Sequence, residues 1–87
     1  MSTIEVHYFA AARAAAGTAL ERVEAPGTLS ELVGQLAAAH SGTTEAGMSL
    51  ASVLERCSFL VDGARSELTA PLDDAARVDV LPPFAGG

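Results

Sequence analysis

The feature that most constrains the fold is one strongly amphipathic helix in a chain whose other segments are short. Apolar residues recur at helical spacing in a single stripe, which comprises Leu29, Leu32, Val33, Leu36 and Ala37. Thr28 precedes this stripe and Glu31 follows Thr28 by three residues, which is the spacing of a capping box that opens a helix. A helix with one apolar face must bury that face, so the remaining segments have to supply a second layer.

Most of the other segments alternate apolar and polar residues, which is the period of a half-buried β-strand. We predict strands over 3–9, 18–25, 58–61, 66–68 and 77–81. Leu20 weakens the second pattern, which an edge strand tolerates. Short helices are predicted over 10–16, stopped by Gly17, and from Leu50 to Cys57. The order predicts an α+β domain, with a mixed sheet of about five strands, one main helix across one face and one or two short helices.

Length and charge limit the function. A chain of 87 residues has room for one domain and little volume for an enclosed active site. Its net charge is −6, and its five basic residues are scattered arginines, which argues against nucleic acid and anionic membranes as partners. No apolar run approaches the ~18 residues of a membrane span. The opening MSTIEV lacks the basic and apolar regions of a secretory signal, so we expect a cytoplasmic protein.

The common catalytic and metal-binding motifs are absent. A phosphate-binding loop of the lysine-containing type cannot form, because the chain has no lysine. Cys57 is the only cysteine, so an internal disulfide and a cysteine-rich zinc site are excluded, and its apolar neighbours favour a buried structural thiol. His7 and His40 are interpreted as surface residues rather than metal ligands. Asp73 and Asp74 are interpreted as part of a solvated turn.

The end of the chain, VDVLPPFAGG, carries the strongest functional signal. Pro82 and Pro83 lack the N–H that would continue a strand ladder, so they end the last strand and project the final residues away from the sheet. Phe84 comes next as an apolar side chain beyond the last strand. Gly86 and Gly87 have no Cβ, so a carboxylate at this end can enter a narrow channel. We therefore divide the chain into a domain over 1–81 and a flexible tail over 82–87.

Strand parity suggests a docking surface beside this tail. If Ile4, Val6 and Tyr8 face the main helix, Phe9 faces the other way, and Leu81 does the same on the last strand. If the first and last strands are parallel neighbours, these two apolar residues share the open face of the sheet at the end where the tail leaves. The alternative is that a loop covers one of them.

The segments YFAAARAAAG, LVDG and VDVLPPFAGG resemble the small subunit of molybdopterin synthase, a branch of the MoaD/ThiS-type ubiquitin-like sulfur carriers with the β-grasp fold. The resemblance covers essentially the whole chain. Arg13 and Gly17 match the strand-to-helix pattern of that family.

The resemblance implies a carrier that is not catalytic alone and binds no metal or tightly held cofactor. An E1-like adenylyltransferase would use ATP to adenylate Gly87, and a sulfurtransferase donor would supply the sulfur of a C-terminal thiocarboxylate. The large subunit of the synthase, in an expected heterotetramer, would then use that sulfur to build molybdopterin from cyclic pyranopterin monophosphate. By position, Gly86 and Ala85 thread the channel, Phe84 with Pro82 and Pro83 anchors the tail, and Phe9 and Leu81 contact partners.

Three alternatives remain open at this point. Carriers that serve thiamine or cysteine biosynthesis end in similar tails. A ubiquitin-like modifier would attach the same tail to lysines of other proteins, although without lysine it could not build chains through its own side chains. A plain interaction module would make no chemical use of its tail.

Overall fold

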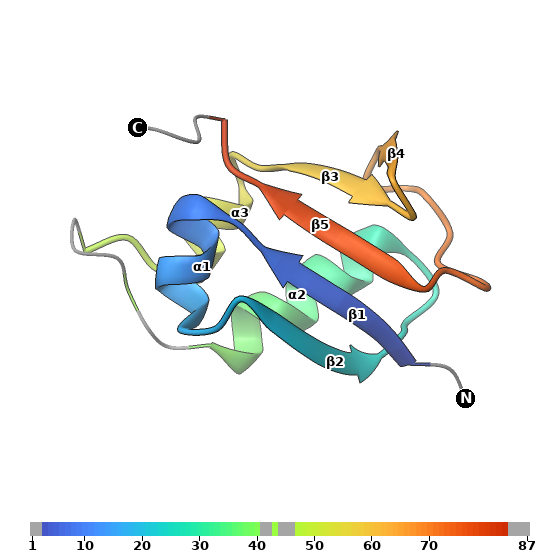
Figure 1. The fold of residues 1–87 in the computed structure, drawn as a ribbon, viewed down its shortest axis with the longest axis horizontal. Helices are drawn as coiled ribbons and strands as arrows, with labels where there is room; N and C mark the ends of the chain where they lie inside the picture. The colour runs from blue at the N-terminus through green and yellow to red at the C-terminus, as the bar shows by residue number, and fades with distance from the viewer. Residues whose placement is uncertain (1–2, 41–42, 44–46, 84–87) are drawn as a thin grey trace.

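The computed structural model describes residues 3–40, 43 and 47–83, and in them it shows five strands and three helices (Figure 1). The strands are β1 (Thr3–Tyr8), β2 (Leu20–Glu24), β3 (Ser58–Val61), β4 (Ala64–Ser66) and β5 (Arg77–Leu81). The helices are α1 (Ala10–Ala16), α2 (Leu29–Ala39) and α3 (Leu50–Leu54). The predicted α+β class, with one main helix and two short ones, is confirmed.

The strands form one mixed sheet in the order β2-β1-β5-β3-β4. The two central strands, β1 and β5, run parallel although they come from opposite ends of the chain, and every other pair is antiparallel. The helices all lie against one face of this sheet, with α2 crossing behind the strands in Figure 1. The predicted edge position of the second strand is confirmed, because β2 ends the sheet on one side.

The core lies between α2 and the covered face of the sheet. Leu29, Leu32 and Leu36 of the predicted stripe are buried, and burial of a leucine side chain contributes about 1.5–3 kcal/mol. Val33 and Ala37 pack at its margin. The sheet and the short helices complete the core with Ile4, Val6, Tyr8, Val78, Val80, Phe59, Leu50, Val53 and Leu54.

The helix ends follow the sequence signals. Thr28 Oγ1 accepts a hydrogen bond from the backbone N–H of Glu31 at 3.3 Å, which confirms Thr28 as the N-cap of α2, and it donates to Oε1 of Glu31 at 3.2 Å. Gly17 ends α1 in the left-handed conformation, with φ of 78°, and its N–H donates to the carbonyl of Arg13 at 2.9 Å. Glycine suits this position because other residues adopt positive φ at a cost.

Four elements have other boundaries than predicted, among them β2, which is Leu20–Glu24 rather than 18–25. The return strand occupies 64–66 rather than 66–68, because Asp62 and Gly63, with φ of 49° and 85°, form a two-residue turn and pairing begins immediately at Ala64. The second short helix stops at Leu54, since the N–H groups of Arg56 and Cys57 bond three positions back in a tight turn. The first strand ends at Tyr8, and Phe9 becomes the N-cap of α1.

Among the described residues, no helix is long and apolar enough to cross a membrane.

Candidate functional site

The parallel pairing of β1 with β5 places Phe9 beside Leu81. Tyr8 pairs with Val80, and the N–H of Phe9 donates to the carbonyl of Val80 at 3.2 Å. Because Tyr8 and Val80 are buried in the core, the next residue on each strand points to the opposite face. Phe9 keeps 40% of its surface exposed, and Leu81 is half-buried. The predicted geometry of these two residues is therefore confirmed.

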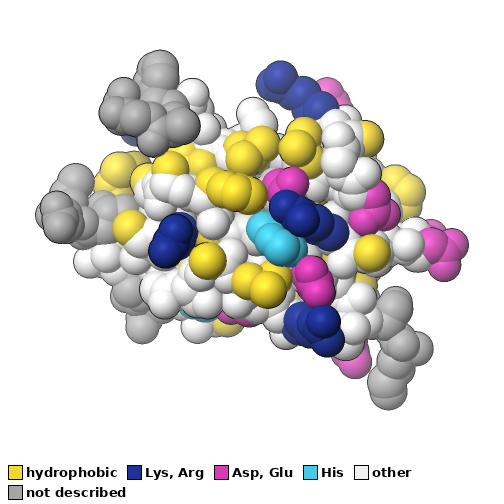
Figure 2. Space-filling view, viewed as in Figure 1, with side chains coloured by type: hydrophobic (Ala, Val, Ile, Leu, Met, Phe, Trp, Pro, Cys, Tyr) yellow, Lys and Arg dark blue, Asp and Glu magenta, His cyan; other side chains and the backbone are white. Residues whose placement is uncertain are grey.

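Two further leucines extend this surface across the neighbouring strands. Leu20 of β2 pairs with His7, and Leu60 of β3 pairs with Asp79, so both lie on the same face as Phe9 and Leu81. We call this uncovered side of the sheet the open face, and Figure 2 shows its hydrophobic side chains on either side of a central histidine with charged neighbours. Sequence reasoning missed Leu20 and Leu60, which only the cross-strand register identifies.

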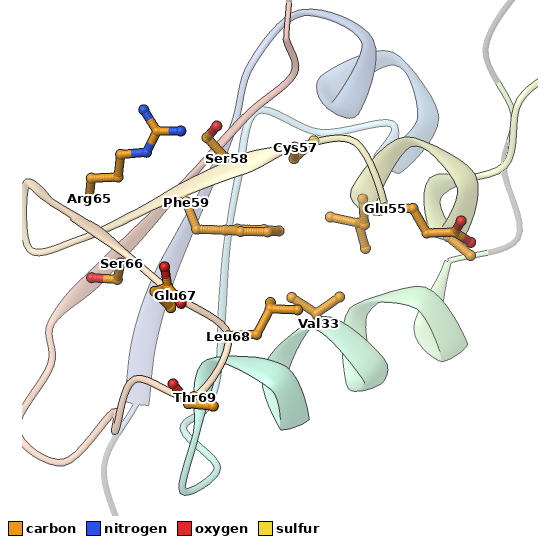
Figure 3. A pocket seen from close by; sticks show the side chains of 12 residues that line it. Val33, Glu55, Cys57, Ser58, Phe59, Arg65, Ser66, Glu67, Leu68 and Thr69 are labelled. Carbon is orange, nitrogen blue, oxygen red and sulfur yellow. The ribbon is translucent and has the colours of Figure 1, made fainter.

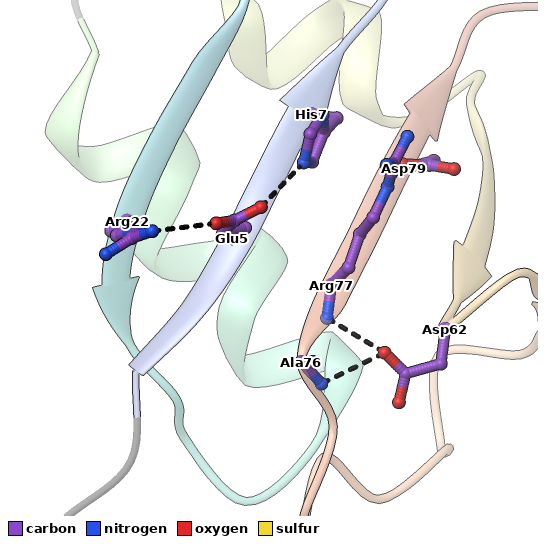
Figure 4. Close-up of polar contacts among 7 residues, drawn as sticks. All are labelled: Glu5, His7, Arg22, Asp62, Ala76, Arg77 and Asp79. Atoms are coloured by element: carbon purple, nitrogen blue, oxygen red, sulfur yellow. Dashed lines mark hydrogen bonds and ion pairs between the residues drawn. The ribbon is translucent and has the colours of Figure 1, made fainter.

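A polar row on β1 and β2 occupies the middle of the open face (Figure 4). Nε2 of His7 lies 3.1 Å from Oε1 of Glu5, and Arg22 donates from Nη2 to Oε2 of Glu5 at 3.0 Å. The hydrogen bond with His7, followed by that with Arg22, holds the pKa of Glu5 below its usual value. His7 is on the open face as predicted, but it is half-buried and held by Glu5 rather than fully solvated.

A second charged pair lies on β5. Arg77 donates from Nε to Oδ1 of Asp79 at 2.6 Å, and Asp79 is only 8% exposed. The pairing satisfies a carboxylate that would otherwise be costly to bury. Because each acid at the centre has a basic partner, a protein that docks on the open face meets apolar side chains around a nearly neutral centre.

The start of β5 is fixed by the hairpin between β3 and β4. Oδ1 of Asp62 accepts hydrogen bonds from the N–H groups of Ala76 and Arg77 at 3.0 and 2.9 Å, and the N–H of Asp62 donates to the carbonyl of Arg77 at 2.9 Å (Figure 4). These contacts anchor the strand that leads to the tail. The sequence predicted Asp62 as a turn residue only.

The tail itself begins where β5 ends at Leu81. Pro82 is half-buried and Pro83 exposed, and neither belongs to the strand, as the missing N–H groups require. Phe84, Ala85, Gly86 and Gly87 lie outside the described residues, so their roles stay predictions.

The other polar residues that were considered as possible functional groups make contacts within the fold. His40 was predicted as a surface residue, but it is half-buried, with Nε2 3.0 Å from Oε2 of Glu21 and its ring edge-on to Tyr8. Cys57 is half-buried, its thiol donates to the carbonyl of Val53 at 3.2 Å, and burial raises its pKa to about 11. Within 3–40, 43 and 47–83, no three potential metal ligands cluster.

The fold defines a class of protein. A mixed five-stranded sheet crossed by one main helix, with parallel first and last strands, is the β-grasp of ubiquitin-like proteins. Residues 6–87 match the family model described as the ThiS family, and the chain belongs to that family. Its members are small ubiquitin-like sulfur carriers that work with partner enzymes. No curated protein matches the chain.

Solved structures from Haloferax volcanii and Pyrococcus furiosus are similar to this chain. SAMP1 from Haloferax volcanii, also solved as small archaeal modifier protein 1, is 22% identical, with a TM-score of 0.73 over 99% of this chain and 100% of that one. A putative molybdopterin converting factor, subunit 1, from Pyrococcus furiosus is 23% identical, with a TM-score of 0.72 over 97% and 100% of the two chains. At these identities the similarity establishes the fold.

Proposed function

We propose that the protein is the sulfur-carrying small subunit of a molybdopterin synthase and works in the cytoplasm. One observation carries the proposal: the ThiS family match extends to Gly87, in a chain whose last strand, β5, ends beside the exposed Phe9 and the half-buried Leu81. The domain thus combines a tail able to carry sulfur with a surface able to hold the enzymes that load and unload it.

The chemistry begins at the α-carboxyl of Gly87, which is ionised at neutral pH because its pKa is about 3.3–3.7. In an E1-like adenylyltransferase this carboxylate attacks the α-phosphate of ATP, forms an acyl-adenylate and releases pyrophosphate. The terminal sulfur of a persulfide on the sulfurtransferase donor then attacks the acyl carbon and displaces AMP. A thiol cleaves the resulting acyl disulfide, forms a disulfide with the donor cysteine and leaves Gly87 as a thiocarboxylate. The carrier itself supplies no catalytic side chain to this step.

Delivery uses the remainder of the tail. Gly86 and Ala85 have little or no side chain and fit a narrow channel in the large subunit, while Phe84 anchors the tail behind them. Pro82 and Pro83 keep the exit extended. In the heterotetramer, the large subunit transfers the sulfur to cyclic pyranopterin monophosphate, where it becomes part of the dithiolene of molybdopterin.

The acceptor can be tested by reconstitution. Thiocarboxylated protein is mixed either with a molybdopterin synthase large subunit and cyclic pyranopterin monophosphate, or with a thiazole synthase and its substrates. We expect molybdopterin in the first mixture and loss of the product when Gly87 is deleted. Thiazole formation without molybdopterin would assign the protein to thiamine biosynthesis instead.

The similarity to SAMP1, which is named a small archaeal modifier protein, favours protein modification as a second candidate function. The same acyl-adenylate would then react with a lysine amine of another protein to form an isopeptide bond. Mass spectrometry of cells that express the tagged protein tests this function, because tail remnants on many lysines would support it and their absence would exclude it.

A further inference from the structure

A second surface lies on the side of the molecule that the helices cover. A cavity of about 510 Å³ opens between α2, α3 and the β3–β4 hairpin, a volume within the range of about 300–1,000 Å³ typical of ligand sites. Its interior is apolar, because Phe59 and Leu68 point into it opposite Val33 (Figure 3), with Leu54 beside them. We call this cavity the β4 groove.

The exposed side chain of Leu68 shows that no other part of the described chain covers the groove. Only three large hydrophobic side chains are exposed in the described part of the chain, and two of them, Phe9 and Leu20, are on the open face. The third is Leu68, which is 48% exposed and extends into the groove. Its backbone is held in place, since its carbonyl accepts the N–H of Ser30 at 2.8 Å. The groove is therefore a fixed apolar surface.

The wall of the groove is an edge strand with free backbone groups. β4 is the last strand of the sheet and pairs only with β3. The two-residue turn makes Val61 and Ala64 a hydrogen-bonded pair, so the next pair, Leu60 and Arg65, is not hydrogen-bonded. The N–H and C=O of Arg65 consequently point outward. The side chain of Arg65 points away from the groove in Figure 3, which leaves its backbone as the lining.

The acidic side chains that line the groove favour a basic partner. Glu55 and Glu67 are exposed lining residues, and Arg65, the only basic lining residue, directs its guanidinium elsewhere. We propose that the β4 groove binds an extended segment of a partner protein, which pairs with the edge of β4, inserts an apolar side chain against Leu68, and carries basic residues beside it. Strand addition of this kind takes affinity from main-chain hydrogen bonds and specificity from side-chain pockets.

Most of the lining of the groove comes from α2, α3 and residues 65–69, and Ser58 connects it with the open face because it pairs with Leu81. The inference goes beyond the proposed function and does not depend on it, because its test measures binding without any activating enzyme.

The test uses a blocked eight-residue peptide of alternating lysine and valine, with a matched peptide in which glutamate replaces each lysine. Amide chemical shifts of the full chain are followed during titration. We expect saturable binding of the basic peptide with a dissociation constant on the order of 0.1–1 mM, and shifts concentrated from Arg65 to Thr69 and at Phe59. The acidic peptide should bind at least about tenfold more weakly.

Variants make the test specific. Leu68→Lys and Glu67→Lys should each weaken binding of the basic peptide about tenfold. The first places a cation in the groove, and the second replaces one of its two carboxylates with a cation. Leu20→Lys is the matched control, since Leu20 is 45% exposed on the open face, and it should leave binding unchanged. The proposal is overturned by any of four results: no saturable binding, shifts centred on the open face, equal loss in the control, or self-association through β4 without peptide.

Discussion

At the scale of single residues, Tyr8 takes part in a group of contacts with Glu21 and His40 that joins β1, β2 and the end of α2. Its ring is buried in the core, and its hydroxyl donates to Oε1 of Glu21 at 3.2 Å. Glu21 also contacts His40, whose ring lies edge-on to Tyr8 with centroids 5.9 Å apart. β1, β2 and the C-terminal end of α2 are thereby joined at a site that no single local sequence pattern contains.

Tyr8 is the only tyrosine, which makes its ionisation measurable by ultraviolet absorbance. Burial, followed by the charge of Glu21, raises the pKa of its phenol well above the ordinary value of 10.0. Since the folded state holds this proton more tightly than the unfolded state, the associated stability is complete below pH ~10 and declines as pH rises above it. We predict that phenolate appears together with alkaline unfolding. Ionisation near pH 10 with the fold intact would contradict this.

The thiol of Cys57 provides a second test. Because burial raises its pKa from 9.0 to about 11, little thiolate is present at neutral pH. We predict that iodoacetamide alkylates the native protein roughly a hundredfold more slowly than the urea-unfolded protein. Equal rates, measured by intact mass over time, would show that the thiol is not protected.

At the scale of elements, the position of β5 depends on Asp62. This residue adopts a positive φ and accepts two backbone hydrogen bonds from the start of β5. We predict that Asp62→Ala lowers the free energy of unfolding by about 1–3 kcal/mol, because it removes the acceptor and disfavours the left-handed conformation. Asp62→Asn should cost less, since asparagine retains an acceptor and tolerates positive φ.

Urea unfolding measures this effect, with Asp73→Ala as the control because Asp73 is exposed in the turn before β5. The control should change the free energy of unfolding by less than about 0.5 kcal/mol. If Asp62→Ala lowered the free energy of unfolding as little as Asp73→Ala does, the contacts of Asp62 would not position β5.

The sequence predicts elements where the signal is local. Thr28, Glu31 and the leucine stripe are close together in the chain, so α2 and its cap could be identified directly, and alternation identified β1, β2 and β5. The order of the strands depends on pairing between the two ends of the chain. For that reason the contact of Glu21 with His40, the burial of Asp79 and the contribution of Leu20 and Leu60 to the open face could not be predicted. Phe9 and Leu81 could be assigned to the open face, because the alternation of side chains along a strand fixes their direction once β1 and β5 are assumed to be parallel neighbours.

At the scale of the whole molecule, the open face and the tail are proposed to act together. We predict that Phe9→Glu leaves the fold intact, because Phe9 is 40% exposed, but slows thiocarboxylate formation at least about tenfold by placing a charge in an apolar contact. Ala38→Glu is the matched control, since it adds the same charge at an exposed position on α2. Circular dichroism checks the fold, and equal rates for both variants would show that the open face is not used in activation.

The central claim is that Gly87 carries sulfur, and intact mass tests it most directly. The protein is incubated with its E1-like adenylyltransferase, ATP and a sulfurtransferase donor, and compared with a variant that lacks Gly87. We predict a mass increase equal to the replacement of one oxygen by one sulfur, located at the C-terminus by fragmentation, in the full chain alone. No mass increase in the full chain, or the same increase in the shortened variant, would contradict the claim.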